Sequence, residues 1–114
     1  MPRPLHHVAF LTLSGLSLAH GGDLRAGSPI TEERAAELEH MVIQDCGSCH
    51  GLTLRGGLGS PLTRDAIGSL PREGLSYIIL DGVPGTAMPP WRPLLSENEA
   101  LWIADYLLNR KEDK

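Results

Sequence analysis

The stretch VIQDCGSCHGLTLRGG, residues 42–57, contains the only two cysteines of the chain, Cys46 and Cys49, and His50 follows the second one directly. Four kinds of chemistry use two cysteines at this spacing: a disulfide, a redox-active thiol pair, half of a zinc site, and covalent attachment of haem. The pair alone does not distinguish them. The fold class of the chain and its other candidate ligands therefore decide the interpretation.

Three of these chemistries are weakened by the surrounding sequence. A disulfide between Cys46 and Cys49 would close so short a loop that it would restrain little of the unfolded chain. A thioredoxin-like pair follows a β-strand of a parallel sheet, whereas the residues before Cys46 have helical spacing and no segment alternates polar and apolar residues. A zinc site needs four ligands, and the sequence has no second cysteine pair to complete one.

The order C-x-x-C-H gives a function to all three residues. Two thiols on one helical turn can add to the two vinyl groups of haem as thioethers, and the next histidine can supply an axial nitrogen to the iron. We therefore predict one haem c, held covalently through Cys46 and Cys49, with His50 as the first iron ligand.

Met88 is the best candidate for the second iron ligand. Met41 fits a core position of the preceding helix, His40 lies on the polar side of that helix, and His20 lies near the N-terminus. Met88 instead belongs to the segment GTAMPPW, whose two prolines stiffen the backbone. Because haem electron carriers pair histidine with methionine, we predict that His50 and Met88 are the metal ligands.

The remaining sequence predicts helices joined by long loops. Thr31 is a candidate N-cap for a helix from about Glu32 to Cys46, and Ser96 with Glu99 forms a capping box at the start of the clearest helix. The other helices are expected at about 63–69, 72–81 and 97–109. Because no strand pattern is present, the predicted fold class is all-α.

The N-terminal residues 1–19 have the layout of a signal peptide, with a basic start, the apolar run VAFLTLSGLSLA and small residues before a cleavage point after Ala19. We expect residues 20–30 to be a flexible mature terminus and residues 31–114 to be the single domain. Export would place the protein in the periplasm, which is an oxidising compartment.

The charge of the expected mature chain restricts its partners. Loss of Arg3 with the signal leaves nine basic and fourteen acidic side chains, a formal charge of −5. This balance weighs against nucleic acid and against an anionic membrane surface, but it permits a basic protein partner. No apolar stretch after the signal is long enough to span a bilayer. We expect a monomer whose partner is another redox protein.

The motif C-x-x-C-H, the later GTAMPPW and the final amphipathic helix together resemble the class I monohaem cytochromes c, from residue 31 to residue 110. The resemblance implies an all-α fold with about four helices wrapped around one covalently bound haem. It also implies that the first and last helices cross, with Trp102 and Tyr106 at the crossing. The protein would be an electron carrier and not an enzyme.

Two stretches, CHGLTLRGGLG and ILDGVPGTAMPPWRPLLSENEALWIADYLLN, look like the small periplasmic cytochrome c55X, which is encoded with the haem-c and haem-d type dissimilatory nitrite reductase of denitrifying bacteria. This resemblance implies electron delivery to that nitrite reductase. The alternatives are a part in maturing the haem d of the reductase and electron donation to another periplasmic oxidoreductase. An enzyme or gas sensor with an open iron site would be the alternative if Met88 did not bind.

The sequence departs from the resemblance in the loop after the motif. Small bacterial cytochromes commonly have Gly-x-Gly-Pro there, with the proline carbonyl accepting a hydrogen bond from the axial histidine. Here the loop is GLGSP, residues 57–61, with the proline one place later. The acceptor for His50 is therefore either the carbonyl of Ser60 or that of Pro61. Candidate partners for the haem propionates are Arg55, Trp91 and Arg92.

Overall fold

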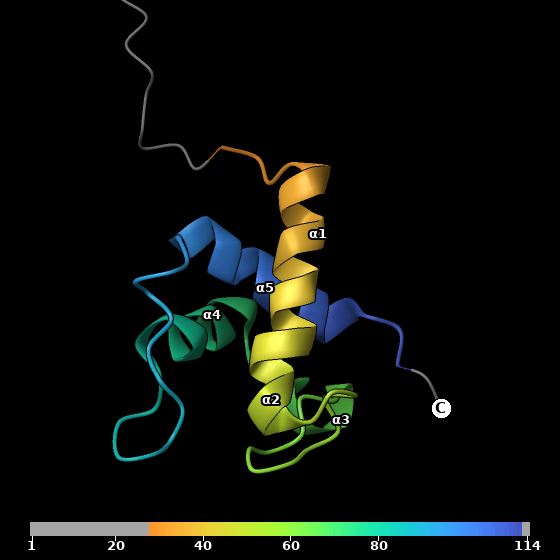
Figure 1. Cartoon of the computed structure of the whole chain (residues 1–114), viewed down its shortest axis with the longest axis vertical. Coiled ribbons are helices and arrows are strands. Elements are labelled where there is room, and N and C mark those ends of the chain that lie inside the picture. The colour runs from red at the N-terminus through yellow and green to blue at the C-terminus, as the bar shows by residue number, and fades with distance from the viewer. Residues whose placement is uncertain (1–27, 113–114) are drawn as a thin grey trace, which may run out of the picture.

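The computed structural model describes residues 28–112, and within them it contains helices and no strand (Figure 1). The expected signal peptide, residues 1–19, and most of the expected mature terminus lie outside the described residues. The elements are α1 (Glu32–Met41), the π-helix η1 (Val42–Cys46), α2 (Gly47–His50), α3 (Arg64–Ile67), α4 (Arg72–Asp81) and α5 (Glu97–Asn109). Because α1, η1 and α2 follow one another without a break, the described helices form four runs, which confirms the expected all-α architecture.

The predicted helix ends are confirmed by their hydrogen bonds. The hydroxyl of Thr31 accepts from the backbone N–H of Arg34 at 3.1 Å and caps α1. The Ser96 hydroxyl accepts from the N–H of Glu99 at 3.2 Å, while the Glu99 carboxylate accepts from the N–H of Ser96 at 2.8 Å, so α5 begins with the predicted capping box. Gly82 ends α4 with a φ of +65°, a conformation that favours glycine.

The first helix differs from its prediction in one respect, because it changes to a π-helix over its last turn before Cys46. The backbone N–H of Gly47 bonds to the carbonyl of Val42, five residues earlier. A π turn contains more residues than an α turn and so changes which side of the helix the following residues face. The C-x-x-C-H motif therefore starts within this shift in helical phase, at Cys46, the last residue of η1.

The core forms where α1 crosses α5 and where α4 packs along α5 (Figure 1). Leu38 and Val42 contribute from the first helical run and are fully buried. Small and aliphatic side chains from the other elements complete this core; they are Leu54, Ile67, Leu75, Ile79, Leu80, Leu95, Ala100, Ile103, Ala104 and Leu107. Burial of such apolar surface is the main source of stability in a domain of this size.

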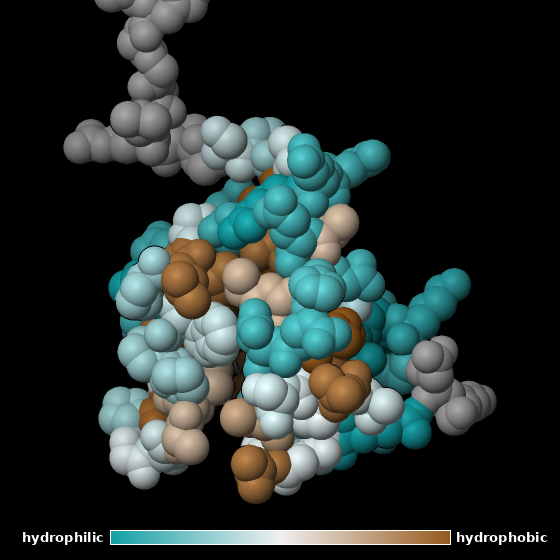
Figure 2. Space-filling view, in the orientation of Figure 1, coloured by the Kyte–Doolittle hydropathy of each residue, from teal (hydrophilic) through white to brown (hydrophobic). Residues whose placement is uncertain are grey.

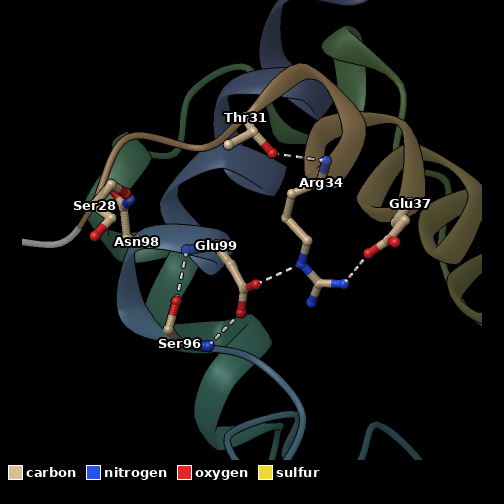
Figure 3. Close-up of polar contacts among 7 residues, drawn as sticks. All are labelled: Ser28, Thr31, Arg34, Glu37, Ser96, Asn98 and Glu99. Carbon is tan, nitrogen blue, oxygen red and sulfur yellow. Dashed lines mark hydrogen bonds and ion pairs between the residues drawn. The ribbon is translucent and has the colours of Figure 1, made fainter.

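Polar contacts hold the two ends of the crossing. The Nε of Arg34 donates to Glu99 on α5 at 2.6 Å, and its Nη1 donates to Glu37 at 2.6 Å (Figure 3). Burial would raise the pKa of the Glu99 carboxyl, but hydrogen bonds from Ser96 and Arg34 outweigh it and hold the pKa below its ordinary value. These contacts fix the N-terminal turns of α1 and α5 against each other.

The aromatic pair on α5 lies at the crossing as the resemblance implied. The hydroxyl of Tyr106 donates to the carboxylate of Glu39 on α1 at 3.0 Å. Trp102 stacks on Tyr106, with ring centroids 5.5 Å apart and planes 11° from parallel. Both rings pack against the buried core. No helix in residues 28–112 is long and apolar enough to cross a membrane.

Candidate functional site

Cys46, Cys49 and His50 lie together on one helical turn, at the end of η1 and in α2. Both cysteines are free thiols; Cys46 is half-buried and Cys49 is exposed. Burial, followed by the charge of Asp45, raises the pKa of the Cys46 thiol to about 11. Because the thiolate is the reactive form in thiol–disulfide exchange, this environment suits a redox thiol pair poorly.

A zinc site is also poorly supported by the surroundings of the motif. Among residues 28–112, no three histidine, cysteine, aspartate or glutamate side chains gather closely enough to hold a metal ion. The two cysteines and His50 thus lack the further protein ligands that a closed zinc site needs.

The imidazole of His50 is held by the loop that follows it. Its Nδ1 lies 2.6 Å from the carbonyl oxygen of Ser60, which resolves the choice between the carbonyls of Ser60 and Pro61. Since a carbonyl oxygen only accepts, the contact assigns the hydrogen to Nδ1 and leaves the Nε2 lone pair free to bind iron. Two thiols and an imidazole in this state are the donor set that covalent haem attachment requires.

Close backbone packing sets the position of the His50 ring. A Cβ at Gly59 would lie 2.8 Å from His50 Nδ1, so only glycine leaves room for the ring. The N–H of Gly59 donates to the carbonyl of Cys49 at 2.7 Å, and the N–H of Gly56 donates to the carbonyl of His50 at 2.8 Å. The loop therefore folds back on the motif and closes one side of the imidazole.

Leu54 anchors this loop, and sequence reasoning missed it. Its side chain is fully buried, although its φ of +59° lies in the left-handed region, which is rare for a branched side chain. Its N–H donates to the carbonyl of Gly51 at 2.8 Å, and its carbonyl accepts from Leu62 at 2.9 Å. The sequence gives little signal, because Leu54 is one of three leucines among the polar and glycine residues of this loop, and the other two, Leu52 and Leu58, are exposed.

Met88 lies on a separate loop that hydrogen bonds fold into a narrow hairpin. The N–H of Val83 donates to the carbonyl of Met88 at 3.2 Å, and the N–H of Thr86 donates to the carbonyl of Val83 at 3.1 Å. The hydroxyl of Thr86 donates to the same Val83 carbonyl at 2.7 Å and accepts from the N–H of Met88 at 3.2 Å. The half-buried Met88 therefore occupies a fixed backbone position.

The Met88 loop reaches its place because α4 ends sharply. A Cβ at Gly82 would lie 2.6 Å from the carbonyl oxygen of Met88 and 2.7 Å from the carbonyl carbon of Pro89, so glycine is required at this turn. Figure 2 shows a hollow in the surface between the loop that follows α4 and the α2 region, with the two segments on either side of it. The structure thus places the segment that contains Cys46, Cys49 and His50 on one side of this hollow and the loop that contains Met88 on the other.

The three candidates for propionate contacts have different surroundings. Arg92 is already paired, because its Nε and Nη2 donate to one carboxylate oxygen of Asp81 at 2.9 and 2.7 Å. The pKa of the Arg92 guanidinium is raised above its ordinary value, and the largest cause is its hydrogen bonding to Asp81. Trp91 is half-buried and packs against the core, and Arg55 is exposed in the loop after the motif.

Comparisons with known proteins show which family this chain belongs to. The family described as cytochrome C oxidase, cbb3-type, subunit III matches residues 33–107. A protein of Paracoccus denitrificans (strain Pd 1222) called cytochrome c55X is 56% identical over 92 residues, which cover 81% of this chain and 88% of that protein. A solved c-type cytochrome NirC superposes with a TM-score of 0.66 at 51% identity, covering 68% of this chain and 92% of the other.

A more distant solved structure is described as dihydro-heme d1 dehydrogenase NirN in complex with DHE, with a TM-score of 0.61 and 28% identity. It matches 67% of this chain, but the matched part is only 16% of that protein. From the site and these relatives, the chain is a small monohaem c-type cytochrome that carries electrons, and it belongs to the family of cytochrome c55X.

Proposed function

We propose that this cytochrome binds one haem covalently through Cys46 and Cys49, with His50 and Met88 as iron ligands, and carries single electrons to a dissimilatory nitrite reductase. The observation that carries the proposal is the His50 ring, hydrogen-bonded to Ser60 at 2.6 Å on the same turn as both free thiols. The expected destination is supported by the names of two relatives, cytochrome c55X and NirC.

Each side chain has a distinct role in this proposal. When bound, haem supplies an iron that changes its oxidation state by one electron. His50 would bind the iron through Nε2, with its ring oriented by the contact with Ser60, and the sulfurs of Cys46 and Cys49 would hold the haem covalently. Met88 would supply the second protein ligand to the iron and so would keep small molecules away from it. Ligands held in place by the protein would move little when the iron changes its oxidation state, which would favour rapid electron transfer.

The test of the ligand set is spectroscopic. A pyridine haemochrome spectrum of the protein, produced with a cytochrome c maturation system, should show haem bound through two thioethers. The oxidised protein should show the near-infrared sulfur-to-iron band, and Met88→Ala should abolish it. A native protein that lacks this band and readily binds carbon monoxide would have an open iron site, and the carrier proposal would fail.

The test of the partner is a stopped-flow experiment. The reduced cytochrome is mixed with oxidised nitrite reductase, and the haem bands of both proteins are followed. Rapid oxidation of the cytochrome supports electron delivery. If the cytochrome transfers no electrons to the nitrite reductase but transfers them rapidly to another periplasmic oxidoreductase, the second protein is the acceptor and the proposed partner is wrong.

A part in maturing haem d is the second candidate, and the likeness to NirN favours it, because that structure is described as a dihydro-heme d1 dehydrogenase. In this role the cytochrome would accept electrons or hold the modified haem during its synthesis. Stable binding of haem d without electron transfer to the reductase would favour maturation over delivery.

We also propose that residues 1–19 are removed on export and that the protein acts in the periplasm. The layout of the N-terminus supports this. The intact mass of the protein recovered from the periplasm tests it, since cleavage after Ala19 gives a chain that starts at His20. Recovery of the uncleaved chain from the cytoplasm would contradict it.

A further inference from the structure

The loop that carries Met88 leaves the protein core and returns to it at the same place. It starts after Asp81, the last residue of α4, and ends at Trp91 and Arg92. The N–H of Trp91 donates to the carbonyl of Ile79 at 3.2 Å, and the N–H of Arg92 donates to the carbonyl of Leu80 at 3.0 Å. Both ends of the loop are therefore attached to the last turn of α4.

A side-chain contact on the protein surface also joins the two ends of the loop. The guanidinium of Arg92 donates twice to one oxygen of Asp81, at 2.9 and 2.7 Å, and its Nη1 lies 3.6 Å from the carboxylate of Glu97 at the start of α5. Between Asp81 and Arg92 the loop contains no charged residue. The pair thus links the residue before the loop to the residue after it.

The pair is too exposed to contribute much to global stability. The side chains of Arg92 and Asp81 are 46% and 56% exposed, and exposed ion pairs contribute little to the free energy of unfolding. A contact between the two ends of a loop can still restrict the loop itself, because opening it raises the entropy of every residue between the ends. Its effect should therefore be concentrated on the segment that contains Met88.

We propose that Arg92 is a positioning residue for the axial methionine: its contact with Asp81 keeps the Met88 loop closed and so slows dissociation of Met88 from the iron. This inference rests on the proposed ligation by Met88. In this role Arg92 contacts a carboxylate of the protein itself, that of Asp81, whereas the sequence made it one of three candidate partners for the haem propionates. The hairpin contacts of Val83 and Thr86 transmit the restriction to Met88.

The experiment measures how fast a small ligand replaces Met88 in the oxidised holoprotein. Imidazole is added in excess, and loss of the near-infrared sulfur-to-iron band is followed by stopped flow. Arg92→Met should speed the replacement about two- to fivefold, the range that corresponds to one exposed ion pair. Arg92→Lys, which keeps the charge but cannot donate through a fork, should fall between Arg92→Met and the native protein.

The chain provides a matched control in Arg72. Its Nε lies 2.7 Å from the carboxylate of Asp105, with the two side chains 42% and 46% exposed, so this pair joins α4 to α5 at a similar distance and exposure but outside the Met88 loop. Arg72→Met should leave the replacement rate unchanged. Amide hydrogen exchange at Val83 and Met88 should rise in Arg92→Met and not in Arg72→Met.

The outcomes separate this inference from the proposed function. If the native protein lacks the sulfur-to-iron band, Met88 is not a ligand, and both proposals are overturned. If the band is present but imidazole replaces Met88 in Arg92→Met at the same rate as in the native protein, only the positioning role is overturned. Equal acceleration in Arg92→Met and Arg72→Met would show a general loosening of the fold and would also overturn it.

Discussion

At the scale of single residues, the axial histidine depends on a neighbour that has no side chain. A Cβ at Gly59 would lie 2.8 Å from Nδ1 and 2.9 Å from Cε1 of His50. Gly59→Ala must therefore move the ring or the loop, at a cost typical of overpacking, about 1–3 kcal/mol. We expect a lower denaturant midpoint of the holoprotein and a shifted reduction potential, because the bond between His50 and Ser60 is disturbed.

The neighbouring Leu58 provides the control for this substitution. Its side chain is 96% exposed, so Leu58→Ala should leave both the denaturant midpoint and the reduction potential close to those of the native protein. An unchanged potential in Gly59→Ala, or equal changes in the two variants, would mean that the ring does not depend on Gly59.

The residues of this site differ in how far the sequence revealed them. Cys46, Cys49 and His50 are adjacent in the chain, and their spacing alone indicates the chemistry. The acceptor for His50 remained a choice between two carbonyls, since a proline displaced by one place does not fix which carbonyl a folded loop turns inward. Leu54 was missed because its burial depends on a positive φ that no sequence pattern signals.

At the scale of the elements, the contact between α1 and α5 should depend on pH. The pKa of Glu99 is lower in the folded protein than in the unfolded chain, so this carboxylate stabilises the fold fully above the unfolded pKa of about 4.3 and loses that effect as the pH falls through the folded value. Glu99→Gln keeps an acceptor for the N–H of Ser96 but loses the charge facing Arg34. Urea unfolding should show a loss of about 0.5–1 kcal/mol at pH 7.

The difference between Glu99→Gln and the native protein should shrink as the pH falls through the lowered pKa of Glu99, because the native carboxylate then becomes protonated and neutral like the glutamine. Glu37→Gln is the matched control, because Glu37 also contacts Arg34 at 2.6 Å but is 58% exposed and belongs to no capping box. Its effect at pH 7 should be smaller. If the loss of unfolding free energy in Glu99→Gln stays the same as the pH is lowered to 3, the loss comes from packing and not from charge.

The elements also show where local sequence patterns stop being informative. Helix caps were predicted correctly, since Thr31, Ser96 and Glu99 satisfy backbone groups within three residues of themselves. The π-helix at Val42–Cys46 was not predicted, because its apolar spacing before Cys46 matches an ordinary helix and only the backbone bond from Gly47 to Val42 distinguishes it. Its place next to the motif fits the tendency of π turns to occur at functional sites.

At the scale of the whole molecule, the net charge is a poor guide to the face that bears the predicted haem ligands. The acidic side chains in residues 28–112 belong to helices, apart from Glu112 after α5. In contrast, residues 46–63 contain one permanent charge, Arg55, and residues 82–91 contain none. Several apolar side chains on these two segments are exposed: Leu52 at 65%, Leu58 at 96% and Val83 at 40%.

This distribution predicts that docking of the electron acceptor depends weakly on salt. Electrostatic steering makes association fall steeply with ionic strength, and salt screens exposed charges over about 10 Å at 0.1 M. Because the segments around the site are nearly uncharged, the second-order rate of electron transfer to the acceptor should change by less than about twofold between 10 mM and 0.5 M NaCl.

Leu58→Glu adds a charge to this face and should introduce a salt dependence, whereas Glu33→Gln on α1 should not alter the native behaviour. A steep fall of the native rate with salt would mean that the acidic helices steer the encounter, and the partner would then need a basic surface.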